Sequence, residues 1–121
     1  MVLIFGGAYM GKQTYARERL GVTEIARCAP APVYDTGCAA GLEQFSLDCA
    51  RRGVDAAQAL LAQKEQWKDC VLIAGDLSCG VVPLDPLERA WREENGKMLR
   101  MLAEQAERVI RIWYGIAQVI K

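Results

Sequence analysis

The sequence predicts an α/β domain, and three observations on its 121 residues support that fold class. Short apolar runs of the kind found in buried strands occur at Val2–Phe5, Cys70–Ala74 and Val109–Trp113. Segments with apolar residues at helical spacing separate these runs. Such alternation is typical of a mostly parallel central sheet with helices on both faces. At this length we expect a single domain over residues 1–121.

The first third of the chain begins with the Val2–Phe5 strand, which ends at two glycines, Gly6 and Gly7. A helical pattern then extends from Gly11 to about Leu20, and Gly21 is a suitable stop signal. Residues 21–41 are rich in Gly, Ala, Pro and Cys. We predict that this segment is mostly loop, with one brief strand at Pro32–Asp35.

The middle of the chain predicts two helices, Leu42–Arg52 and Asp55–Trp67, divided at Gly53. Asp55 is a reasonable N-cap for the second helix, because its side chain can accept a hydrogen bond from the first turn. The strand Cys70–Ala74 follows, and a turn-rich stretch comes after it.

The last third predicts a long helix and two strands. Asp85 can cap the helix, Pro86 fits its first position, and Glu88 suits a capping box. Its apolar stripe, which Glu94 and Asn95 interrupt, consists of Leu87, Trp91, Met98, Leu102 and Ala106. Beyond the strand at Val109–Trp113, Gly115 predicts a turn into a last strand, Ala117–Lys121, and thus an antiparallel pair at the carboxyl end.

Composition excludes several classes of partner. The 15 basic and 15 acidic residues cancel, which argues against a nucleic acid or an anionic membrane. No signal peptide is recognisable, and no apolar run reaches the roughly 20 residues of a membrane span, so a cytoplasmic protein is expected. Its five cysteines are never at CxxC spacing and are expected to be reduced thiols. Histidine is absent.

The glycine-rich segment after the first strand resembles a phosphate-binding loop, GxxxxGK[ST]. Glycines let backbone N–H groups converge on phosphate oxygens, the helix start favours an anion, and a lysine reaches the outer phosphates. The predicted nucleotide-binding residues are Gly6, Gly7, Ala8, Tyr9, Met10, Gly11, Lys12, Gln13 and Thr14. They predict a P-loop nucleotide-binding fold that takes GTP or ATP with Mg²⁺. The alternative is a glycine-rich strand–helix turn without a ligand.

Gln13 departs from that motif, in which a Ser or Thr hydroxyl binds the Mg²⁺ that bridges the phosphates. An amide oxygen can coordinate Mg²⁺, but the longer Gln side chain needs another metal position or an intervening water. Thr14 carries a hydroxyl, yet one residue further along a helix rotates it by about 100°.

The second half of the chain, from IAGDLSCGVVPLD at residues 73–85 to its end, carries a more specific pattern. Its matching residues are Gly80, Val81, Val82, Pro83, Asp85, Arg89, Trp91, Arg92, Glu93, Gly96, Lys97, Ala106, Glu107, Val109, Gly115 and Lys121. Together with GGAYMGK at residues 6–12, they resemble the adenosylcobinamide kinase/adenosylcobinamide-phosphate guanylyltransferase (CobU-type) family, in a shortened form. The two blocks cover about residues 1–20 and 71–121.

This resemblance implies a P-loop enzyme that phosphorylates adenosylcobinamide and then attaches GMP from GTP, and that forms trimers. In the full-length family the guanylylated nucleophile is a histidine, in a segment that this chain does not contain in full. We therefore expect the kinase step, with nucleotide and corrinoid as ligands and the guanylyltransferase step lost. The alternative is a degenerate relative that binds nucleotide or corrinoid without turnover.

Asp76 falls where the family has Glu, at the end of the second buried strand. It is expected to act with Lys12 in catalysis, by holding Mg²⁺ through water or accepting a substrate proton; a turn or cap carboxylate is the alternative. The Gln13 amide is the second candidate metal contact, directly or through water. The segment from Gly80 through Val82 and Pro83 is expected to form a second loop over the same cleft.

Three further charged residues are weaker candidates for the substrate cleft. Asp35 follows the brief predicted strand and is either a Walker B-type acid or, more in keeping with Thr36-Gly37 after it, an Asx-turn residue. Arg89 and Arg92 either reach an anion at the cleft or lie on the solvated face of their helix.

Overall fold

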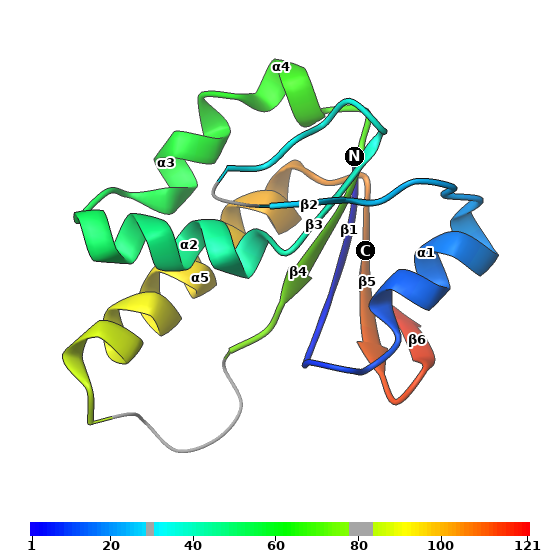
Figure 1. Ribbon diagram of the computed structural model, residues 1–121. Helices are drawn as coiled ribbons and strands as arrows, with labels where there is room; N and C mark the ends of the chain where they lie inside the picture. Colours follow the sequence, from blue (N-terminus) through cyan, green and yellow to red (C-terminus); the bar gives the residue numbers. More distant parts are fainter. Residues whose placement is uncertain (29–30, 78–83) are drawn as a thin grey trace.

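Figure 1 shows the computed structural model, which describes residues 1–28, 31–77 and 84–121. The sheet has the strand order β2-β3-β4-β1-β5-β6. Its strands are β1 (Val2–Gly6), β2 (Ala26–Arg27), β3 (Cys38–Ala40), β4 (Val71–Gly75), β5 (Arg108–Trp113) and β6 (Ile116–Val119). The helices are α1 (Lys12–Leu20), α2 (Leu42–Arg52), α3 (Ala56–Leu61), α4 (Lys64–Trp67) and α5 (Pro86–Gln105).

Neighbouring strands are parallel from β2 to β5, and only β6 runs antiparallel, against β5. The predicted α/β class, the mostly parallel sheet and the antiparallel carboxyl-terminal pair are thereby confirmed. Helix α1 covers one face of the sheet, and the other helices lie on the opposite face (Figure 1). A separate apolar core fills each interface: Ile4 and Ile73 belong to the α1 side, and Leu3 and Leu72 to the other.

The strand predicted at Pro32–Asp35 is wrong. The two strands of this region are β2 and β3, and Asp35 lies in a turn that the Gly37 N–H closes on the Tyr34 carbonyl, 3.0 Å away. Small side chains explain the position of β3, because Cys38, Ala39 and Ala40 are all buried between the layers that cover the sheet.

The helix predicted over Asp55–Trp67 is also wrong as a single element, because α3 and α4 are separate. Trp67 turns inward at the end of α4 and is fully buried. Its indole N–H donates to the carbonyl of Leu60, 2.8 Å away, which holds the two short helices together. The predicted cap at Asp55 is present, since its carboxylate accepts from the Gln58 N–H.

The carboxyl ends of β1, β3 and β4 meet at one edge of the sheet. Gly6 pairs with Gly75 at the last register position of β1 and β4, and the Asp76 N–H donates to the Gly6 carbonyl at 2.9 Å. A Cβ on Gly6 would lie 2.5 Å from the carbonyl oxygen of Ile112 in β5. A side chain at residue 6 would therefore force β1 and β5 apart at the point where the glycine-rich loop begins.

Candidate functional site

The glycine-rich loop joins β1 to α1 at this edge of the sheet. Gly11, the N-cap of α1, has φ +94°, a left-handed conformation that favours glycine, and no side chain caps the helix. The first N–H groups of α1 therefore remain available to an anion. Tyr9 also has a positive φ, of +60°, and its side chain is fully exposed.

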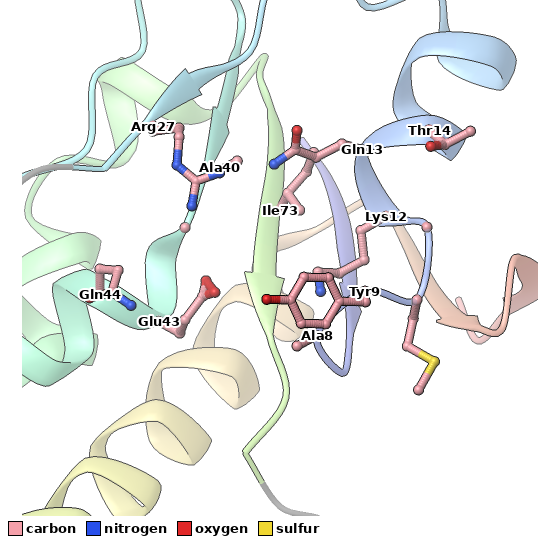
Figure 2. Close-up of a pocket in the computed structure, with 13 residues that line it drawn as sticks. Ala8, Tyr9, Lys12, Gln13, Thr14, Arg27, Ala40, Glu43, Gln44 and Ile73 are labelled. Atoms are coloured by element: carbon pink, nitrogen blue, oxygen red, sulfur yellow. The ribbon is translucent and has the colours of Figure 1, made fainter.

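A cavity of about 490 Å³ lies between the loop and the connection from β3 to α2. Figure 2 shows the loop and Lys12 on one side and Arg27, Glu43 and Gln44 on the other. Helix α2 also begins here, after Gly41, which has φ +76° and no side-chain cap. Two uncapped helix N-termini thus border one cavity, an arrangement that favours a negatively charged ligand.

Lys12 projects back over the loop that precedes it. Its Nζ donates to the carbonyl oxygens of Gly7, 2.6 Å away, and Gly6, 3.1 Å away. Burial lowers the pKa of Lys12 below its usual 10.5, while the charges of Glu43 and Asp76 act in the opposite direction. A cation held by neutral carbonyl oxygens is well placed to exchange those carbonyls for phosphate oxygens.

Glu43 is a functional candidate that the sequence reasoning missed. It lies in the first turn of α2 and lines the cavity, and its Oε1 accepts a hydrogen bond from the Gly75 N–H at 3.1 Å. Gly75 leaves room for this contact, because a Cβ there would lie 2.9 Å from Glu43 Oε2. The available signal was an acidic residue just after Gly41 and Leu42, at a helix start.

Asp76 directly follows β4 and lies behind the loop. Its backbone is fixed to Gly6, and the residue borders two smaller cavities, of about 330 and 120 Å³, rather than the 490 Å³ cavity. The smaller of these also touches Gly7 and Arg111. The charge of Asp76 still raises the pKa of Lys12, so the carboxylate acts on the lysine without lining the main cavity.

A buried polar network fixes Gly75 from the other side. The Asn95 side-chain amide donates to the Gly75 carbonyl at 2.9 Å, and its Oδ1 accepts from the Ser46 hydroxyl at 2.8 Å. The Trp91 indole N–H donates to the Glu43 backbone carbonyl at 2.8 Å. Asn95 is only 1% exposed, so the residue that interrupts the apolar stripe in the sequence is a buried connector between α5, α2 and β4.

The remaining predicted site residues are only partly brought together. Gln13 and Thr14 both line the cavity; the Gln13 amide points into it, and the side chain of Thr14 points away from Gln13 (Figure 2). Asp35 is exposed and precedes β3, so it lies at the opposite edge of the sheet from the loop. Arg89 and Arg92 lie on α5 and do not line the cavity.

The segment formed by Gly80, Val82 and Pro83 lies outside the described residues. Gly96, one of the residues that carry the family resemblance, leaves open space: apart from the backbone of its own helix, no described atom lies within 4 Å of the place a Cβ would take. It borders the apolar 330 Å³ cavity under α5.

The cavity offers oxygen donors of the kind that Mg²⁺ takes in proteins. Within the described ranges there is no group of three or more His, Cys, Asp or Glu side chains that could hold a metal ion. Mg²⁺ in phosphoryl-transfer sites commonly takes only one or two carboxylates, the other ligands being phosphate oxygens and water. The Glu43 carboxylate and the Gln13 amide supply hard oxygen donors in the same cavity.

Comparison with known proteins gives one family. A family model described as "Cobinamide kinase / cobinamide phosphate guanyltransferase" matches residues 38–120, from β3 through β6. The glycine-rich loop precedes the matched range, so its assignment rests on its own sequence and geometry. No curated protein matches the chain. No helix in the described part of the chain is long and apolar enough to cross a membrane.

Proposed function

The chain belongs to the cobinamide kinase / cobinamide phosphate guanyltransferase family, and from this premise we propose that it phosphorylates a cobinamide hydroxyl with ATP or GTP. Adenosylcobinamide is the proposed acceptor, as the family resemblance implies. The observation that carries the proposal is the position of Lys12, which lies over the glycine-rich loop and faces Glu43 across one cavity.

The proposed role of the loop is to bind the phosphates. The N–H groups at the start of α1 bind phosphate oxygens, and Lys12 turns from the Gly6 and Gly7 carbonyls to the outer phosphates. These donors stabilise the charge that spreads over the phosphoryl oxygens during transfer. Gln13 and Glu43 would hold Mg²⁺, which when bound neutralises charge on the phosphate oxygens.

The transfer itself exchanges one P–O bond for another. The acceptor hydroxyl oxygen bonds to the terminal phosphorus, and the bond from that phosphorus to the nucleoside diphosphate breaks. The hydroxyl proton passes to a carboxylate, for which we propose the Glu43 oxygen that does not hold the metal, because Glu43 lines the cavity. Asp76 contributes through its charge on Lys12, or by a water-mediated metal contact.

The histidine-dependent guanylyltransferase step is proposed to be lost, because the 121 residues contain no histidine. Gln13 in place of a hydroxyl residue supports a second candidate, a module that binds nucleotide or corrinoid without turnover. A trimeric assembly and a cytoplasmic location remain predictions.

The decisive experiment incubates the purified protein with adenosylcobinamide, Mg²⁺ and labelled ATP or GTP. Lys12→Ala is the test variant, and Lys64→Ala, which removes an exposed lysine on α4, is the matched control. Loss of a phosphate-binding cation is expected to slow phosphorylation by about 100-fold or more. Circular dichroism checks that both variants fold.

Each result separates the two candidates. Phosphorylated corrinoid that depends on Lys12 supports the kinase. Nucleotide binding without product supports the binding module, and a protein that binds neither nucleotide nor corrinoid would refute both.

A further inference from the structure

Arg27 occupies an unusual place for a charged residue of the sheet. It is the last residue of β2, the edge strand, and pairs with Ala40 of β3. Paired residues in parallel strands share a face, and Ala40 belongs to the core on the α1 side. The Arg27 side chain therefore leaves the sheet on the side of α1, at the carboxyl ends of the parallel strands, where the glycine-rich loop also lies.

The neighbours of Arg27 let its side chain extend over the sheet. Ala40 ends at its Cβ and Gly41 has no side chain, so nothing large on β3 separates Arg27 from the cavity. Figure 2 shows the guanidinium extending along the cavity, opposite the Gln13 amide and across from Lys12.

Among the described residues, the Arg27 guanidinium makes no contact that would explain it as a structural residue. In the described part of the chain, no salt bridge or hydrogen bond joins it to another side chain or to the backbone. The cavity thus has two cations, Lys12 and Arg27, on opposite sides, with the carboxylate of Glu43 on the Arg27 side. Arginine presents a planar fork of N–H donors that matches a phosphate group bidentately.

We propose that Arg27 contacts the terminal phosphate of a bound nucleoside triphosphate, from the side opposite Lys12. The inference rests on the proposed function and deepens it, because it identifies the residue that distinguishes a triphosphate from a diphosphate. The loop and the start of α1 hold the inner phosphates, which both nucleotides share. Arg27 reaches across the cavity to the group that only the triphosphate carries.

The test is calorimetric titration with Mg²⁺ and non-hydrolysable triphosphate analogues or diphosphates of adenosine and guanosine. The variants are Arg27→Ala, Arg27→Lys and, as matched control, Arg51→Ala, which removes an exposed arginine of α2. Arg27→Ala is expected to weaken triphosphate binding about tenfold and diphosphate binding by less than about twofold. Arg27→Lys keeps the charge without the fork and should fall between the wild type and Arg27→Ala.

The outcomes are distinguishable. Equal loss for triphosphate and diphosphate, or no loss for either, overturns the inference while leaving the proposed function intact. A wild-type protein that binds no nucleotide overturns both. Since Arg27 is exposed, its variants are expected to unfold at the wild-type temperature, and thermal unfolding checks this.

Discussion

The backbone N–H of Gly115 donates a 2.8 Å hydrogen bond to the carbonyl of Met10, so the turn between the last two strands supports the glycine-rich loop. Tyr114 and Gly115 have φ values of +50° and +78°, as the two central residues of a tight hairpin turn require. This contact links residues near the two ends of the sequence.

Gly115→Ala is predicted to weaken nucleotide binding as well as stability. An L side chain at this positive φ costs about 1 kcal/mol and distorts the turn that holds Met10. Gly53→Ala is the matched control, because Gly53 has φ +68° at the end of α2, away from the loop. Urea unfolding should show a similar loss for both variants, and titration should show weaker binding only for Gly115→Ala. Equal nucleotide affinities for the two variants would contradict the prediction.

Gly75→Ala is predicted to displace the Glu43 carboxylate, because the new Cβ would lie 2.9 Å from its Oε2. We expect the Mg²⁺ concentration for half-maximal nucleotide binding to rise about tenfold. Gly96→Ala is the control: its Cβ meets open space within the described structure, and replacing a helical glycine should stabilise α5 by up to about 1 kcal/mol. If Gly75→Ala leaves the Mg²⁺ dependence unchanged, the metal is not held by Glu43.

Nucleotide affinity is predicted to fall at alkaline pH, because Lys12 loses its proton there. Burial lowers its pKa below 10.5, and a phosphate ligand favours the protonated form. Affinity should therefore stay constant below the lowered pKa and fall as the pH rises through it. Lys12→Arg should bind nucleotide without this fall, because arginine remains charged. A titration series from about pH 7 to about pH 10 tests the difference.

The lowered pKa of Lys12 also affects the stability of the ligand-free protein. Here the effect has the opposite sign: stability rises with pH, whereas nucleotide affinity falls. Between the lowered pKa of Lys12 and 10.5, the unfolded state keeps a proton that the folded state has released. The contribution of Lys12 to the free energy of unfolding therefore rises with pH in this window. Lys12→Met should remove that contribution, and urea unfolding at several pH values measures it.

Asn95→Ala is predicted to destabilise the protein by about 1–3 kcal/mol, because the Gly75 carbonyl and the Ser46 hydroxyl lose a buried partner. Ser46→Ala alone should also destabilise. Combining the two should cost less than the sum of the single changes, since both variants break the Ser46–Asn95 hydrogen bond. Strict additivity in urea unfolding would show that the two side chains act independently.

Continuous apolar runs made the central strands predictable, because β1, β4 and β5 lie inside the sheet between its two apolar cores. Strand β3 lacked that signal, since Cys38-Ala39-Ala40 is short and has no β-branched residue. Conversely, Val33 and Tyr34 suggested a strand that tertiary structure does not form. The strand propensity of the residues predicts a strand poorly where the segment is short, because its pairing then depends on the neighbouring strands.

The loop side of the site was readable from the sequence because its residues are consecutive, from Gly6 to Lys12. The opposite side was not, because Arg27 and Glu43 come from β2 and α2 and meet only through the sheet. Asn95 was misread as an interruption for the same reason: its partners, Ser46 and Gly75, are distant in sequence.

Gly75 has both of its backbone polar groups occupied by side chains, its N–H by Glu43 and its carbonyl by Asn95. These two side chains come from different helices, α2 and α5. One residue at the tip of β4 therefore acts as a mechanical joint between them. A substitution that shifts α5 at Asn95 is therefore expected to change the position of the Glu43 carboxylate as well, because both side chains are hydrogen-bonded to the same residue.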